Sequence, residues 1–96
     1  MQILAMCRRK TESFTQAEFD VVLDDEAEGV RRLYAQGIVR QAWTREDVPG
    51  ACLMLEVESL AQAEAAMATL PLSMRGMLEV QLVPLRGYRG FGPRNP

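Results

Sequence analysis

Residues 15–37, TQAEFDVVLDDEAEGVRRLYAQG, carry a full set of signals for one long helix. Thr15 is a favourable N-cap, and Glu18 three positions later completes a capping box, in which each side chain accepts a hydrogen bond from the other residue's backbone N–H. The phenylalanines at positions 14 and 19 can form a hydrophobic staple across this start. Gly37 provides the C-terminal stop. We therefore predict a helix here and place the other elements around it.

Glu26 interrupts the apolar face of this helix. At about 100° per residue, the apolar side chains of the segment fall on one face: Phe19, Val22, Leu23, Val30, Leu33 and Tyr34. Glu26 lies near the centre of that face, whereas the other acidic residues point mostly sideways or outward. Burying an unpaired carboxylate costs several kcal/mol, so such a residue is rarely kept for stability. We interpret Glu26 as a candidate general base whose pKa is raised by desolvation. A solvated or arginine-paired carboxylate is the alternative.

The remaining pattern completes a simple order of elements. Strands are predicted at residues 2–7, 38–44, 51–57 and 77–85, and a second helix begins at Ser59, with Gln62 in a second capping box, and ends at Pro71. The order β-α-β-β-α-β is typical of the ferredoxin-like α+β fold with an antiparallel sheet. We predict one domain over residues 1–85, followed by a C-terminal arm or tail over residues 86–96.

The third predicted strand is apolar on both faces. Ala51, Leu53, Leu55 and Val57 face one way, and Cys52 and Met54 face the other. Two helices can cover only one face of a four-stranded sheet, so the second apolar face needs another partner. Two sheets packed face to face would form a dimeric α/β barrel. We therefore predict a homodimer or a higher even homo-oligomer; a monomer with one exposed apolar face is the alternative.

Composition excludes several classes of function. The net charge of −2 gives no surface for nucleic acid or membrane, and no apolar run approaches the roughly 20 residues of a membrane span. The chain has no histidine, which excludes the usual zinc site, and we expect no metal and no cofactor. The apolar start precedes the basic residues, the reverse of a signal peptide. We expect a cytoplasmic protein in which Cys7 and Cys52 are reduced.

Three further residues are candidates for substrate binding. Arg40 on the second strand can bind a substrate carboxylate or meet Glu26, although an ordinary strand-edge charge is the simpler interpretation. Trp43 would be a pocket wall or a packing residue. Tyr34 lies about two turns beyond Glu26, where its hydroxyl would be a donor at the site or would simply reach solvent.

The tail, RGYRGFGPRNP, alternates arginines with aromatic residues and prolines. It is too short to be a nucleic-acid motif. Aromatic residues spaced by glycines suit an arm that lies on a neighbouring subunit, and disorder beyond Phe91 is the alternative.

Beyond these patterns, the chain resembles the muconolactone Δ-isomerase family over about residues 25–83. The resemblance rests on the acidic pair 25–26 in the first helix, the Gly37 turn, Arg40 and Trp43 on the second strand, the short apolar third strand, and the segments Leu-Pro-Leu at 70–72 and Leu-Glu-Val at 78–80. It implies a dimeric α/β barrel and a cofactor-free double-bond shift in an unsaturated lactone that bears a carboxylate. In that reaction the carboxylate matching Glu26 carries the proton through a dienolate.

The segment after the second strand, REDVPGA at 45–51, contains neither the Tyr nor the His that the family has there. Glu26 and the resemblance together still favour an isomerase-like enzyme in which Glu26 shuttles a proton on a small anionic lactone or enolisable acid. Two alternatives stay open: a cofactor-free monooxygenase or decarboxylase on the same fold, and a non-catalytic oligomer that binds a small ligand.

Overall fold

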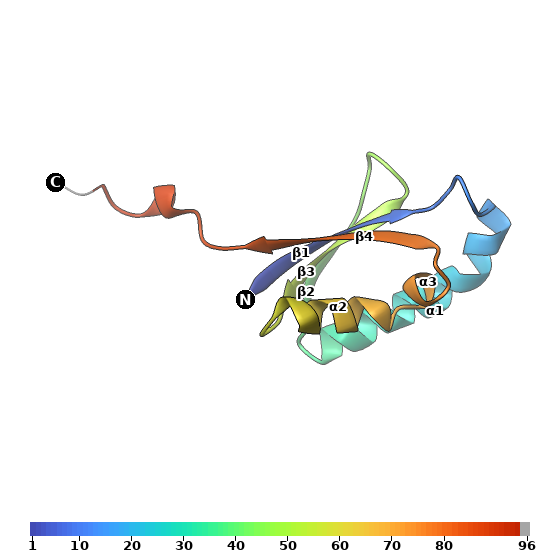
Figure 1. The fold of residues 1–96 in the computed structure, drawn as a ribbon, viewed down its shortest axis with the longest axis horizontal. Coiled ribbons are helices and arrows are strands. Elements are labelled where there is room, and N and C mark those ends of the chain that lie inside the picture. The colour runs from blue at the N-terminus through green and yellow to red at the C-terminus, as the bar shows by residue number, and fades with distance from the viewer. Residues whose placement is uncertain (95–96) are drawn as a thin grey trace.

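A four-stranded antiparallel sheet forms one layer of the protein, and the helices cover one of its faces (Figure 1). The computed structural model describes residues 1–94. The elements in chain order are β1 (Gln2–Arg9), α1 (Gln16–Ala35), β2 (Val39–Thr44), β3 (Gly50–Glu56), α2 (Leu60–Ala68), α3 (Pro71–Met74), β4 (Leu78–Leu85) and the 3₁₀ turn η1 (Arg89–Phe91). The strand order is β2-β3-β1-β4, so β2 and β4 are the edges. The predicted ferredoxin-like arrangement is confirmed.

The start of α1 has the predicted caps. The Glu18 N–H donates to Thr15 Oγ1 at 3.2 Å, and the Thr15 N–H donates to Glu18 Oε1 at 2.8 Å, which closes the capping box. The rings of Phe14 and Phe19 meet edge to face with centroids 6.0 Å apart, which forms the staple. Local sequence thus fixes where α1 begins and how the chain enters it.

The end of α1 is a Schellman motif around Gly37. Gly37 has φ +80°, a left-handed conformation that favours glycine. Its N–H donates to Tyr34 O at 3.0 Å, and the Ile38 N–H donates to Leu33 O at 2.9 Å. These two bonds satisfy carbonyls that the helix itself leaves free, and they turn the chain directly into β2.

The second helical region differs from the prediction. The Gln62 N–H donates to Ser59 Oγ at 3.1 Å, but the Gln62 side chain accepts from the Glu58 N–H rather than from Ser59, so the second capping box is only half formed. Pro71 was predicted to end this helix. Instead α2 ends at Ala68 and Pro71 begins the one-turn helix α3, because proline suits the first position of a helix, where an N–H is not needed.

The two faces of the sheet have different environments. The helix-covered face carries the core side chains of the central strands: Ile3, Ala5, Cys7, Leu53 and Leu55. The opposite face carries apolar side chains that are only half-buried: Leu4, Met6, Cys52, Met54 and Val83. The predicted division of the third strand into two apolar faces is therefore confirmed. No helix within residues 1–94 is long and apolar enough to cross a membrane.

Residues 86–94 extend away from the end of β4 as an arm (Figure 1). The arm contains η1, in which the rings of Tyr88 and Phe91 pack edge to face with centroids 5.2 Å apart. The last two residues of the predicted tail, 95–96, lie outside the described part of the chain.

Candidate functional site

Glu26 on α1 reaches the start of α3. Its Oε1 accepts a hydrogen bond from the Leu72 backbone N–H at 2.8 Å. The first N–H groups of a helix have no partner inside the helix, and the N-cap residue of α3, Leu70, has no side-chain acceptor. Pro71 has no N–H to satisfy. The carboxylate of Glu26 therefore caps α3 from another helix and is held in a fixed position.

Glu26 also lines a pocket of about 260 Å³ between α1, α3 and the helix-covered face of the sheet. Most of the lining is apolar, including Leu23, Val30, Leu53, Leu70 and Leu78. The polar groups on the lining come from Glu26, Arg9, Cys7 and Thr44. An apolar cavity with a few polar groups is the usual form of a small-molecule site.

Burial raises the pKa of the Glu26 carboxyl above 4.5, because desolvation disfavours the charged form. The hydrogen bond from the Leu72 N–H acts in the opposite direction and lowers the pKa, but the desolvation effect is larger. Among residues 1–94, Glu26 has no ion-pair partner. The predicted alternative of a carboxylate paired with a structural arginine is therefore not what the structure contains.

Cys7 lies on the same wall of the pocket, and its thiol is not a nucleophile at neutral pH. Burial raises the pKa of Cys7 to about 12, with a further contribution from the charge of Glu26. Only the thiolate reacts as a nucleophile, so a thiol with this pKa is inert. Both Cys7 and Cys52 are free, as predicted. Any proton transfer in the pocket therefore falls to Glu26 rather than to Cys7.

Arg9 provides the positive charge of the pocket lining. Its guanidinium lies over the ring of Phe19, 5.6 Å from the centroid, which orients the side chain through a cation–π contact. A guanidinium binds a carboxylate through two parallel hydrogen bonds. The pocket lining thus carries a carboxyl group, from Glu26, and a guanidinium, from Arg9, without an ion pair between them.

The loop between β2 and β3 joins two residues of the pocket lining, Thr44 and Gly50. Arg45 holds this loop through two hydrogen bonds to Asp47, from Nε to Oδ1 at 3.0 Å and from Nη2 to Oδ2 at 2.6 Å. These bonds lower the pKa of Asp47 to about 2. The segment that lacks the family's Tyr and His is therefore an ion-paired turn.

The three predicted substrate-binding residues do not surround Glu26 in the single chain. Tyr34 is 65% exposed and Trp43 is 47% exposed. Trp43 pairs with Cys52 in the β2–β3 register, which places it on the face of the sheet that the helices leave open. Arg40 is exposed at a register irregularity between Val39 and Gln41 and is not part of the pocket lining. Their roles in binding stay predictions.

Two members of the site are not among the site residues predicted from the sequence. Arg9 follows Cys7 by two positions on β1, so strand alternation places both on the helix-covered face, and this signal was available. Leu72 contributes through its backbone N–H, and the only local sign is the proline before it at the first position of α3. Within residues 1–94, no group of three or more His, Cys, Asp and Glu side chains is placed to hold a metal ion.

Comparison with known proteins shows similarity in structure only. No protein-family model matches the chain, and no curated protein sequence matches it. The crystal structure of muconolactone isomerase superposes with a TM-score of 0.74 at 16% identity and covers 100% of both chains. The chain has the muconolactone isomerase fold. The predicted resemblance is thereby confirmed at the level of the fold.

A second solved structure shares this fold. It is 5-chloro-2-hydroxyhydroquinone dehydrochlorinase from Burkholderia phenoliruptrix, in complex with 2,5-dihydroxybenzoquinone. The TM-score is 0.69 at 14% identity, over 94% of this chain and 98% of that chain. The muconolactone isomerase fold thus occurs in proteins named for two different reactions, so the fold alone does not determine the reaction of this chain.

Proposed function

We propose that this protein is a cofactor-free enzyme that moves a proton within a small anionic lactone or enolisable acid, with Glu26 as the proton carrier. The observation that carries this proposal is the position of Glu26, a desolvated carboxyl with a raised pKa that lines a pocket. A general base works best when its pKa lies near the operating pH. Glu26 Oε1 accepts from the Leu72 N–H, so in this proposal Oε2 is the oxygen that takes the proton.

Arg9 would bind the carboxylate of the substrate and orient the ring carbon towards Glu26. In the proposed reaction Glu26 removes a proton from that carbon to leave a dienolate, and the same carboxyl returns the proton two carbons away. Atoms balance without a co-reactant, because the substrate is only isomerised. The roles of Arg40, Tyr34 and Trp43 in binding are retained as part of this proposal, to be tested by substitution.

Pocket size supports a small substrate. The volume of about 260 Å³ lies below the roughly 300–1,000 Å³ of pockets for drug-sized ligands. A monooxygenase or decarboxylase that acts on polyketide-like aromatic molecules would need a larger and mainly apolar cavity. The charged pair of lining residues, Glu26 and Arg9, favours an anionic substrate instead.

Deuterium exchange tests the proposed proton transfer directly. Muconolactone and simpler unsaturated lactones with a carboxylate would be incubated with the protein in D₂O, and loss of ring protons would be followed by NMR. We expect the wild-type protein to accelerate exchange and Glu26→Gln to lower the rate by about 10²–10⁴-fold. Asp24→Asn, an exposed carboxylate on the same helix, is the matched control. Exchange that survives Glu26→Gln undiminished would refute the role of Glu26, and absence of any catalysed exchange would refute the class of substrate.

Arg9 has a separate test. Arg9→Gln should raise KM with little change in kcat, because it removes binding energy that substrate and transition state share. Lys10→Gln loses the same charge one position along the chain, just past the end of β1, and Lys10 is not part of the pocket lining. If the two substitutions raise KM equally, only the overall positive charge near the pocket matters, and the assignment of Arg9 as the group that binds the substrate carboxylate would fail.

Dimerisation through the open sheet face is the second part of the proposal. The half-buried side chains Leu4, Met6, Met54 and Val83 lie on this face, as does Trp43. A second copy packed on this face would bury them and form a closed barrel, with about 800 Å² buried on each partner in a stable dimer of standard size. Met54→Glu should convert the dimer to a monomer in sedimentation velocity, whereas Val21→Glu, an exposed site on α1, should not. A wild-type monomer at micromolar concentration would contradict this arrangement.

A further inference from the structure

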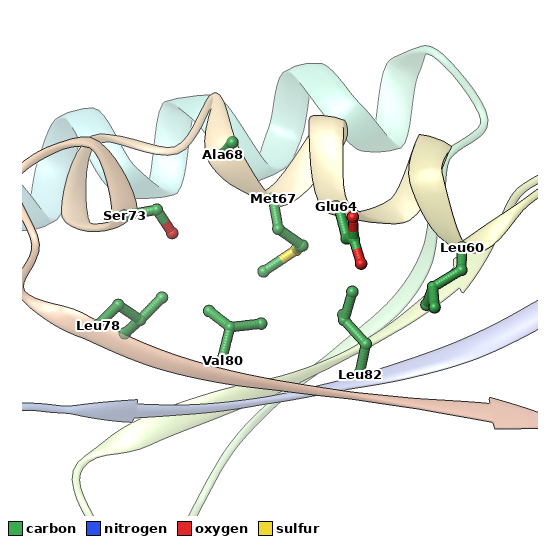
Figure 2. Close-up of a pocket in the computed structure, with 8 residues that line it drawn as sticks. All are labelled: Leu60, Glu64, Met67, Ala68, Ser73, Leu78, Val80 and Leu82. Carbon is green, nitrogen blue, oxygen red and sulfur yellow. The ribbon is translucent and has the colours of Figure 1, made fainter.

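A second pocket, larger than the first, lies between α2 and the edge strand β4 (Figure 2). Its volume is about 480 Å³. The side chains of Val80 and Leu82 rise from β4 to form its floor, and Leu60 and Met67 point towards them from α2. The pocket is therefore an apolar slot at one edge of the sheet, separate from the position of Glu26.

Two polar groups on the walls of this pocket have no partner within residues 1–94. Ser73 Oγ is buried without a hydrogen bond, and Figure 2 shows it directed towards the space above β4. Glu64 is the one charged residue of α2 and takes part in none of the ion pairs of the described residues. Buried polar groups are normally hydrogen-bonded, so an orphaned hydroxyl in a pocket indicates a missing partner. The pocket thus suits an occupant with an apolar ring, a hydroxyl and a positive charge.

The arm at 86–94 carries all three groups. Tyr88 and Phe91 are 73% and 89% exposed, although their rings are packed against each other. The arm has arginines at 86, 89 and 94 and no acidic residue, so its charge is complementary to that of Glu64. Its hydrogen bonds within the described chain join only residues 88–92 to one another, and Figure 1 shows it projecting away from the body.

We propose that the arm of a second copy of this chain docks in the α2–β4 pocket. Tyr88 inserts over Val80 and Leu82 with its hydroxyl donating to Ser73 Oγ, and Arg89 pairs with Glu64. This contact is distinct from the open sheet face, and it does not depend on the proposed reaction at Glu26.

Chain geometry excludes the protein's own arm as the occupant. Ser73 lies beside Leu78, at the start of β4, and the arm leaves from Leu85 at its end. Seven residues of strand span about 23 Å at 3.3 Å per residue. The Cα atom of Tyr88, three residues beyond Leu85, can return by at most about 11 Å. The remaining distance is longer than a tyrosine side chain, so only another copy can bring a Tyr88 hydroxyl to Ser73.

Photo-cross-linking tests the contact in the full chain. Phe91 is replaced by p-benzoylphenylalanine, and ¹⁴N- and ¹⁵N-labelled proteins are mixed before irradiation. Trypsin releases residues 46–75 as one peptide, which contains α2 and Ser73. We expect cross-links from the arm to positions 60–73 of this peptide, half of them joining unlike isotopes. Cross-links that join like isotopes only, that map to the open sheet face, or that do not form at all would each overturn the proposal.

A charge exchange tests the pairing of Glu64 with Arg89. Glu64→Arg should lower the yield of cross-link at least fivefold, and adding Arg89→Glu to the same chain should restore it. Two substitutions at exposed positions serve as controls. Glu58→Arg makes the same change in charge as Glu64→Arg, and Arg75→Glu makes the same change as Arg89→Glu. Neither control should change the yield of cross-link. The proposal fails if Glu64→Arg has no effect, or if Glu58→Arg lowers the yield equally.

Discussion

The carboxylate of Glu26 caps the helix that begins at Pro71, with Oε1 2.8 Å from the nitrogen of Leu72, which lies 46 positions further along the chain. Glu26 thereby joins α1 to α3 while it lines the pocket. A truncation at Glu26 would remove the cap and the proposed base together. Separating the two roles requires a side chain that keeps the acceptor and loses the charge.

Glu26→Gln and Glu26→Ala should therefore differ in stability. Glutamine keeps a carbonyl oxygen that can accept from the Leu72 N–H, so we expect its free energy of unfolding at pH 7 to equal or exceed that of the wild type. Alanine leaves a partly buried N–H unsatisfied and should lower that free energy by about 1–3 kcal/mol. Urea unfolding followed by circular dichroism measures both. If both substitutions lower the free energy of unfolding equally, the hydrogen bond from the Leu72 N–H to Glu26 does not contribute to stability.

The raised pKa of Glu26 predicts a specific dependence of stability on pH. The folded chain binds this proton more tightly than the unfolded chain, since burial raises the folded pKa above 4.5. The stabilising contribution of protonated Glu26 is complete below the unfolded pKa and is lost as pH rises through the folded pKa. Glu26→Gln cannot lose a proton there, so its stability relative to the wild type should increase across that window.

Carbon-13 NMR of the Glu carboxyl groups gives the direct measurement. Comparison with Glu26→Gln assigns the resonance of Glu26, and its midpoint should lie above that of Glu28. Glu28 is a useful internal reference, because its hydrogen bond to Arg31 lowers its pKa. A Glu26 midpoint at or below 4.5 would mean that the Leu72 N–H outweighs desolvation, and the case for Glu26 as a base would weaken accordingly.

Capping residues in the sequence predicted both ends of α1, and the helical periodicity of apolar residues identified Glu26. The hydrogen bond between Glu26 and the Leu72 N–H could not be predicted from the sequence. The capping box at the start of α1 joins residues three positions apart, and the bonds at its end join residues three to five positions apart, so the local sequence specifies both caps. The cap of α3 comes from a residue far away in the chain, and only the packed fold brings the two together. The same limit explains Trp43: it is close to Arg40 in sequence, but the sheet separates it from Glu26.

Gly29 controls how closely α1 approaches the start of α3. A Cβ atom at this position would lie 3.0 Å from Leu70 Cδ2 and 3.5 Å from Pro71 Cδ. Leu70 is buried in the core and has little room to move. Gly29→Val should therefore destabilise the protein by about 1–3 kcal/mol and lengthen the hydrogen bond from Leu72 to Glu26.

The control for Gly29→Val is Ala35→Val, which introduces the same side chain at an exposed position of α1. It reports the helix-propensity cost of valine relative to alanine, a few tenths of a kcal/mol, whereas the change from glycine to valine improves helix propensity, so a loss of stability in Gly29→Val comes from the close approach. Thermal unfolding and the NMR midpoint of Glu26 would be measured for both. If Gly29→Val is no less stable than Ala35→Val, the close approach of α1 and α3 does not matter for the fold.

Cys7 provides an independent test of how well the pocket wall is shielded from water. Burial raises its pKa to about 12, so at pH 8 only about one thiol in 10⁴ is ionised, against roughly one in four for an ordinary cysteine. In a Cys52→Ser background, iodoacetamide should leave Cys7 unmodified in the folded protein and modify it rapidly in urea, with mass spectrometry as the readout. Glu26→Gln removes a negative charge that helps to raise the pKa of Cys7, so alkylation of the folded variant should be faster than in the Cys52→Ser protein alone. Rapid alkylation of Cys7 in the folded protein, with Glu26 intact, would show that solvent reaches this side of the pocket. The pKa of Glu26 is raised by the same exclusion of solvent, so that result would also count against a raised pKa for Glu26.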